Sequence, residues 1–152
     1  MGIQPTMSNS ALQSMGVFIG EWEIEISSFR ADPSARFLGH ASFRWAEGGS
    51  FVLMQAQVPS SDFPSSTALM GPDDLAGTYC MLYFDSRGVS RIYQMSLSEN
   101  AWKLWRDFPD FSQRFTATFN NDHNVLAGSW EASTDGMNWE HDFNIKYTKI
   151  EK

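Results

Sequence analysis

The chain has 152 residues, of which 42% are hydrophobic, 14% aromatic and 19% charged, a composition typical of one globular domain rather than of a disordered segment. The net charge of -7 and the lack of a basic cluster argue against nucleic acid and against an anionic membrane surface as partners. Cys80 is the only cysteine, which excludes an intrachain disulfide and a thiolate metal cluster and favours a cytoplasmic location.

The N-terminal part is expected to be a tail followed by a short helix. Residues 1–8 are polar and carry Pro5, so we expect a flexible tail, with residues 9–152 forming the domain. Ser8 or Ser10 can cap a helix that runs to Met15 and ends at Gly16. In a barrel this helix could cover one mouth, or it could be an ordinary helical turn.

A strict alternation of apolar and acidic residues marks the first strand. Trp22, Ile24 and Ile26 fall on one face, and three glutamates fall on the other. A period of two predicts a half-buried strand. Similar patterns, separated by turns such as Gly48-Gly49 and Asp135-Gly136, predict about nine strands in all. They are residues 22–29, 37–45, 51–58, 75–84, 89–97, 101–107, 111–119, 125–132 and 139–148.

Two of these segments have special features. Residues 59–74 contain Pro59, Pro64 and Pro72 and break the rhythm of the strands, so they are expected to be either a lid or binding loop or a plain surface excursion. Residues 75–84 are apolar on both faces, which predicts a strand that is covered on both sides.

The short connections favour antiparallel neighbours and exclude βαβ units. A sandwich and a barrel both remain open. Consecutive hairpins favour the barrel, and closure removes the exposed edges that so aromatic a set of strands would present. The predicted fold is therefore all-β: a single antiparallel up-and-down barrel of about 8–10 strands with a short N-terminal helix.

The segment Gly20-Glu21-Trp22 resembles the Gly-x-Trp signature of the lipocalin and fatty-acid-binding superfamily, the calycins. Segments 111–115, 128–131, 133–136 and 139–143 are similar to uncharacterised bacterial lipocalin-like proteins that have a domain of unknown function. The resemblance implies a barrel and no established activity. It also implies that Trp22 packs across the barrel floor beneath a basic side chain of the last strand, here Lys146 or Lys149 in place of the usual arginine.

A barrel of this size either fills its interior with side chains or encloses one small ligand. Alternation places an apolar and aromatic set with a few polar groups inward, as in ligand pockets. The alternative is that the same residues simply form the core. The candidate ligand-binding residues are Trp45, Met54, Tyr79, Tyr93, Met95, Trp105, Arg106, Gln113, Phe115, Trp130 and His141.

The leading hypothesis is a barrel that binds a small hydrophobic or amphipathic molecule. A second is an enzyme that uses His141 or Tyr93 as acid or base on a hydrophobic substrate. A third is a haem-binding barrel with His141 as the axial ligand, although the leading hypothesis needs no cofactor and no metal. A fourth is a filled barrel that acts through its surface, and a homodimer stays open.

Overall fold

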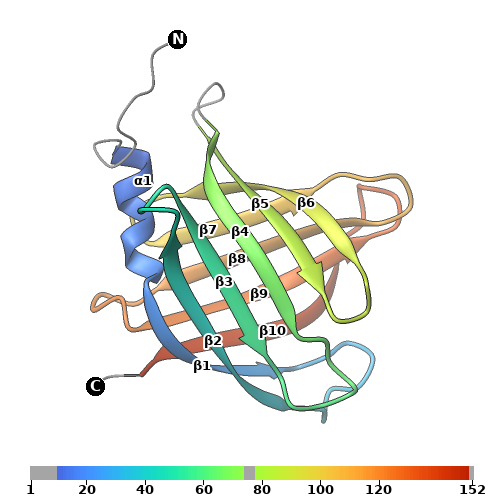
Figure 1. The fold of residues 1–152 in the computed structure, drawn as a ribbon. Helices are drawn as coiled ribbons and strands as arrows, with labels where there is room; N and C mark the ends of the chain where they lie inside the picture. Colours follow the sequence, from blue (N-terminus) through green and yellow to red (C-terminus); the bar gives the residue numbers. More distant parts are fainter. Residues whose placement is uncertain (1–9, 74–77, 151–152) are drawn as a thin grey trace.

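The computed structural model describes residues 10–73 and 78–150 as a short helical segment and ten strands (Figure 1). The elements are α1 (Ser10–Ser14), the 3-10 helix η2 (Met15–Phe18), β1 (Gly20–Ser27), β2 (Phe37–Ala46), β3 (Phe51–Gln57), β4 (Ser66–Asp73), β5 (Thr78–Asp85), β6 (Ser90–Leu97), β7 (Ala101–Arg106), β8 (Ser112–Phe119), β9 (Val125–Ser133) and β10 (Glu140–Lys149). The expected tail, residues 1–8, lies outside the described residues.

Each strand pairs antiparallel with the next in sequence, and β1 closes the sheet by pairing with β10. The predicted up-and-down barrel is confirmed, and the sandwich is excluded. Closure follows from the alternation, because each strand has one apolar face that must be buried and consecutive hairpins curl these faces around a common interior. None of the helices in the described ranges is both long enough and apolar enough to cross a membrane.

The structure has one strand more than the nine that the sequence predicts. The additional strand is β4, which lies within residues 59–74, the stretch expected to break the rhythm of the strands. Ala68 and Met70 are buried on its inner face, and Pro72 lies opposite Tyr79 close to the end of the strand. The prolines and small residues of this stretch gave no strand signal in the sequence. Pairing with β3 and β5, rather than its own β propensity, holds the segment extended. The preceding residues of the same stretch remain a connection between β3 and β4.

The helical segment closes one end of the barrel. Leu12, Met15 and Phe18 are at most 1% exposed. The Phe18 ring stacks on Phe43 of β2 and meets the edge of Trp102 of β7, so it touches side chains from separate parts of the barrel wall. The Tyr79 hydroxyl of β5 donates a 2.7 Å hydrogen bond to the carbonyl of Ala11. This end of the interior is therefore filled.

Trp22 lies at the same end, where its indole N–H donates to the carbonyl of Phe18 at 2.8 Å. Lys149 of β10 places its ammonium 5.3 Å from the centre of the Trp22 ring, which makes Lys149, and not Lys146, the basic side chain over this tryptophan. Gly20 leaves room for that lysine: a Cβ at Gly20 would lie 2.7 Å from Lys149 Cε, and its φ of +141° disfavours other residues.

The outer face of β5 and β6 is uncovered in the described part of the chain. Leu82 is 37% exposed, and the neighbouring Phe84 and Ile92 are 47% and 69% exposed. Leu82 and Ile92 face each other across the two strands. The prediction that the strand at residues 75–84 is covered on both sides is therefore wrong for residues 78–84, and residues 75–77 lie outside the described residues. Apolar composition on both faces reports β propensity as well as burial.

Candidate functional site

A cavity of about 220 Å³ occupies the other half of the barrel. It is lined by Phe63 and Pro64 from the β3–β4 connection, Arg87 from the β5–β6 turn and Phe111 from the β7–β8 connection. Alternate connections of a meander share one end, so this cavity opens at the end opposite the helical segment. The chain thus fills one end of its barrel and leaves the other hollow.

The wall of the cavity is mostly apolar. The strands contribute mainly inward-facing residues, and the apolar members from within the strands include Ile24, Ile26, Met54, Ala56, Met81, Trp102, Leu104, Phe115, Trp130, Phe143 and Ile145. Trp130 packs against Phe115 and Tyr93, with ring centres 5.0 and 5.4 Å apart. An apolar wall with few polar groups is the usual composition of a small-molecule site.

Four phenylalanines meet at the open end. Phe63 lies within 6.0 Å, centre to centre, of the rings of Phe29, Phe37 and Phe143, and Phe29 stacks on Phe143 at 5.4 Å. These residues come from the β1–β2 connection, β2, the β3–β4 connection and β10. We call them the mouth cluster. Phe63 and Phe143 also line the cavity, so one side of the entrance is aromatic.

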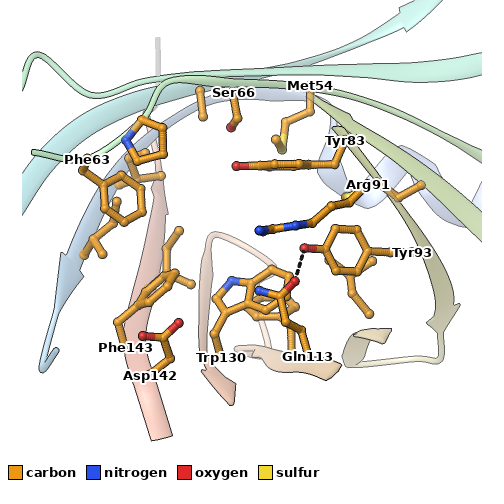
Figure 2. A pocket seen from close by; sticks show the side chains of 18 of the residues that line it. Met54, Phe63, Ser66, Tyr83, Arg91, Tyr93, Gln113, Trp130, Asp142 and Phe143 are labelled. Atoms are coloured by element: carbon orange, nitrogen blue, oxygen red, sulfur yellow. Dashed lines mark hydrogen bonds between the residues drawn. The ribbon is translucent and has the colours of Figure 1, made fainter. Parts of the chain in front are cut away.

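Polar groups gather on the side of the cavity formed by β6 and β8 (Figure 2). The Tyr93 hydroxyl donates a 2.9 Å hydrogen bond to Gln113 Oε1, and both side chains are buried. Burial raises the pKa of Tyr93, although Arg91 opposes this rise. The Arg91 side chain points into the cavity (Figure 2), opposite Tyr83 on the neighbouring strand, with its guanidinium carbon 5.4 Å from the centre of the Phe111 ring.

An ion pair holds the β5–β6 turn at the rim. Arg87 donates to the Asp85 carboxylate, with a shortest distance of 2.7 Å, and the Tyr83 hydroxyl donates to the same group at 2.8 Å. Burial alone would raise the pKa of Asp85, but the hydrogen bonds from Arg87 and Tyr83 outweigh it and lower that pKa to about 2. The charge of Arg87 is thus neutralised within the turn.

A β-bulge in β10 places Asp142 in the cavity wall. His141 pairs with Glu131, but the next paired residue, Phe143, lies opposite Trp130, so β10 carries one extra residue at this point. As a result Asp142 and Phe143 both line the cavity, and Figure 2 shows the Asp142 carboxylate beside Phe143. Burial raises the pKa of Asp142, and the nearby His141 and Arg30 partly oppose this rise.

The cavity brings together five of the eleven candidate residues: Met54, Tyr93, Gln113, Phe115 and Trp130. Three others face inward at the filled end: Trp45 packs beside the helical segment, Tyr79 bonds to it, and Met95 pairs with Tyr79. Whether the five in the cavity bind a ligand stays a prediction.

The remaining three candidates lie outside the cavity wall. Trp105 pairs with the outward-facing Gln94 and Arg114, so its expected inward placement is wrong. Arg106 shares the inner face of β7, as alternation predicts, but its guanidinium lies over the Phe108 ring at 5.0 Å. The inward placement of His141 is wrong because the bulge reverses the alternation.

His141 faces outward and is exposed, with its Nε2 3.0 Å from the carbonyl oxygen of Ser28. It therefore cannot reach a molecule in the cavity. None of the residues that line the cavity is a histidine.

Sequence reasoning missed Arg91, Tyr83, Asp142 and Phe63. The alternation of the strands could have identified two of them. Arg91 shares a face with Tyr93 and Met95, and Tyr83 shares one with Tyr79 and Met81. Phe63 lies in a connection and Asp142 in a bulge, where alternation gives no orientation.

No protein-family model and no curated protein matches this chain, so the lipocalin resemblance has no support from a family match. Among solved structures, the chain is similar to Rv2717c from M. tuberculosis with a TM-score of 0.63. The two chains are 12% identical, and the similarity covers 93% of this chain and 98% of the other. At this identity the similarity shows the fold and nothing about activity.

Proposed function

We propose that this protein is a lipocalin-like barrel that binds a small amphipathic molecule in its interior. The observation that carries the proposal is the half-filled barrel: one end is packed by Leu12, Met15 and Phe18, while the other keeps a cavity of about 220 Å³. Empty apolar space inside a protein loses packing energy. A barrel that acts only through its surface is therefore expected to be filled at both ends. The polar groups on one wall favour an amphipathic ligand over a purely apolar one.

Two alternatives depend on His141, either as a general base or as a haem ligand. Both are disfavoured because His141 faces outward, away from the cavity. The enzyme alternative that rests on Tyr93 keeps its residue in the cavity wall. However, burial raises the pKa of Tyr93, which makes its ionised form less accessible at neutral pH and so disfavours it as a base. Binding without chemistry is therefore the function that these residues support best.

The probe 2-naphthol, a small amphipathic molecule whose fluorescence depends on the polarity of its surroundings, tests the proposal. Ala56 lines the cavity, whereas Ala127 is exposed on β9. The same enlargement at the two positions separates the cavity from the surface. We expect Ala56→Met to weaken binding of the probe roughly tenfold, because three added heavy atoms occupy ligand space. We expect Ala127→Met to leave the affinity unchanged.

Equal affinities in the two variants would mean that the probe binds elsewhere, and the proposal would fall. Circular dichroism of both variants controls for folding. Native mass spectrometry of the protein isolated from its own host then identifies the natural ligand by its mass.

A further inference from the structure

The geometry points to a compact aromatic ligand with two polar ends, an acidic group held by Arg91 and a hydrogen-bond donor, such as a hydroxyl or an amine, held by Asp142. The inference rests on the proposed function and specifies its ligand class. It follows from three observations on the cavity: the set of donors on one side, the acceptor on the other, and the space between them.

The first observation is the state of Arg91. Arg30, Arg36, Arg87 and Arg114 each pair with a carboxylate at 2.9 Å or less. Arg91 points into the cavity (Figure 2), lies beside the Tyr93 hydroxyl, and forms no ion pair with a carboxylate among residues 10–73 and 78–150. A partly buried guanidinium without a counter-charge favours an anion, and its planar fork fits a carboxylate.

Gln113 strengthens the preference for an acceptor. Its Oε1 already accepts the hydrogen bond from Tyr93, so its amide N–H groups are the part that is left for a ligand. Gln113 and Arg91 both line the cavity and lie on the same side of it (Figure 2). This side therefore offers hydrogen-bond donors, as the acidic group of a ligand requires.

The second observation is Asp142, which reaches the cavity from the side opposite Arg91 (Figure 2). In the described part of the chain no side chain donates a hydrogen bond to its carboxylate, and the Arg30 N–H donates to its backbone carbonyl instead. A carboxylate in an apolar wall is costly unless a donor meets it. A ligand with only an acid and an apolar tail would leave Asp142 facing that tail.

The third observation is size. An apolar protein cavity of about 150 Å³ accepts benzene, so 220 Å³ suits one ring with substituents at both ends. Tyr83, Trp130 and Phe143 present their rings to the same space, and ring faces favour a flat partner. Taken together, the donors, the acceptor and the rings specify a short flat molecule rather than a long flexible chain.

The probes para-hydroxybenzoate, benzoate and phenol test the inference by calorimetric titration, because the last two each lack one polar group. We expect para-hydroxybenzoate to bind at least about tenfold more tightly than either, since each missing group leaves a protein group unpaired. Arg91→Met should weaken para-hydroxybenzoate and benzoate about tenfold and leave phenol unchanged. Asp142→Asn should weaken para-hydroxybenzoate and phenol but not benzoate.

Matched controls are Arg44→Met and Asp107→Asn, which change the same residue types at exposed positions and should alter no affinity. Asp142→Asn preserves side-chain shape, so it remains informative if Arg91→Met does not fold.

Equal affinities for the three probes, or variants that bind as the wild type does, would overturn the inference. If 2-naphthol still binds in the way that Ala56→Met disrupts, the proposed function survives that result. If 2-naphthol, para-hydroxybenzoate, benzoate and phenol all fail to bind, the inference and the proposed function fall together.

Discussion

Two tryptophans of the barrel interior, Trp22 and Trp102, differ in the surroundings of a single N–H group. Both are 1% exposed. Trp22 donates to the Phe18 carbonyl at 2.8 Å, whereas the Trp102 Nε1 has no hydrogen-bond partner among the described residues. The Trp102 ring packs against the rings of Phe18 and Phe115, with ring centres 4.8 and 5.1 Å apart. Ring packing of this kind does not replace a hydrogen bond to the buried N–H.

The difference predicts unequal costs for the same substitution. Trp22→Phe removes a donor and leaves a buried carbonyl unsatisfied, whereas Trp102→Phe removes an unsatisfied donor. Both variants lose a similar volume, so we expect Trp22→Phe to lower the free energy of unfolding by at least about 1 kcal/mol more than Trp102→Phe. Urea denaturation measures both values, and equal losses would show that the Trp102 N–H has a partner after all.

The helical segment is the element on which the filled end depends. Phe18 is fully buried and contacts Phe43, Trp102 and Phe119. We expect Phe18→Ala to lower the free energy of unfolding by about 3–5 kcal/mol, the usual cost of removing a buried phenyl ring. Phe84→Ala, on the exposed outer face of β5, should change it by no more than about 0.5 kcal/mol. Similar losses at both positions in thermal or urea unfolding would contradict this account of the segment.

Strand by strand, the sequence predicts the elements that follow simple alternation and misses those whose shape neighbours impose. β1 from Trp22 and β8 from Gln113 alternate with a period of two, and both were predicted with their faces correct. β4 carries Gly71 and Pro72, and only its pairing with β3 and β5 makes it a strand. Local propensity cannot report such a tertiary effect.

The bulge in β10 has the larger consequence for the site. Extending the alternation from Ile145 and Phe143 places His141 inward, and one extra residue reverses that orientation. A bulge depends on how two strands meet, so a single sequence does not reveal it. The fold was thus predictable from many redundant alternations. Of the polar groups in the cavity wall, Tyr93 and Gln113 were predicted, whereas Asp142 in the bulge and Arg91 were not.

At the scale of the whole molecule, closure separates two environments that the sequence does not distinguish. Inward-facing residues of every strand look alike, yet those near the helical segment are packed and those near the mouth cluster border a cavity. Which half is hollow depends on where the helical segment docks, and no pattern within the strands carries that information. Whether the protein forms a homodimer is untested, and sedimentation equilibrium would measure its oligomeric state.

The four tyrosines of the chain report on the integrity of the whole barrel. Burial raises the pKa of Tyr79, Tyr83, Tyr93 and Tyr147 above the ordinary value of 10.0. A raised pKa in the folded state means that the stabilisation is fully present below pH 10 and is lost as the pH rises further, because the unfolded chain releases its phenol protons first.

We therefore expect tyrosinate absorbance to appear above pH 10 in one cooperative step, together with the loss of the circular dichroism of the barrel. In urea all four phenols should titrate near pH 10, which serves as the control. Gradual ionisation near pH 10 with unchanged circular dichroism would contradict the burial of these side chains.

Because Tyr83 and Tyr93 line the cavity, a ligand that fills it should shift the alkaline transition to higher pH, as any ligand of the folded state does.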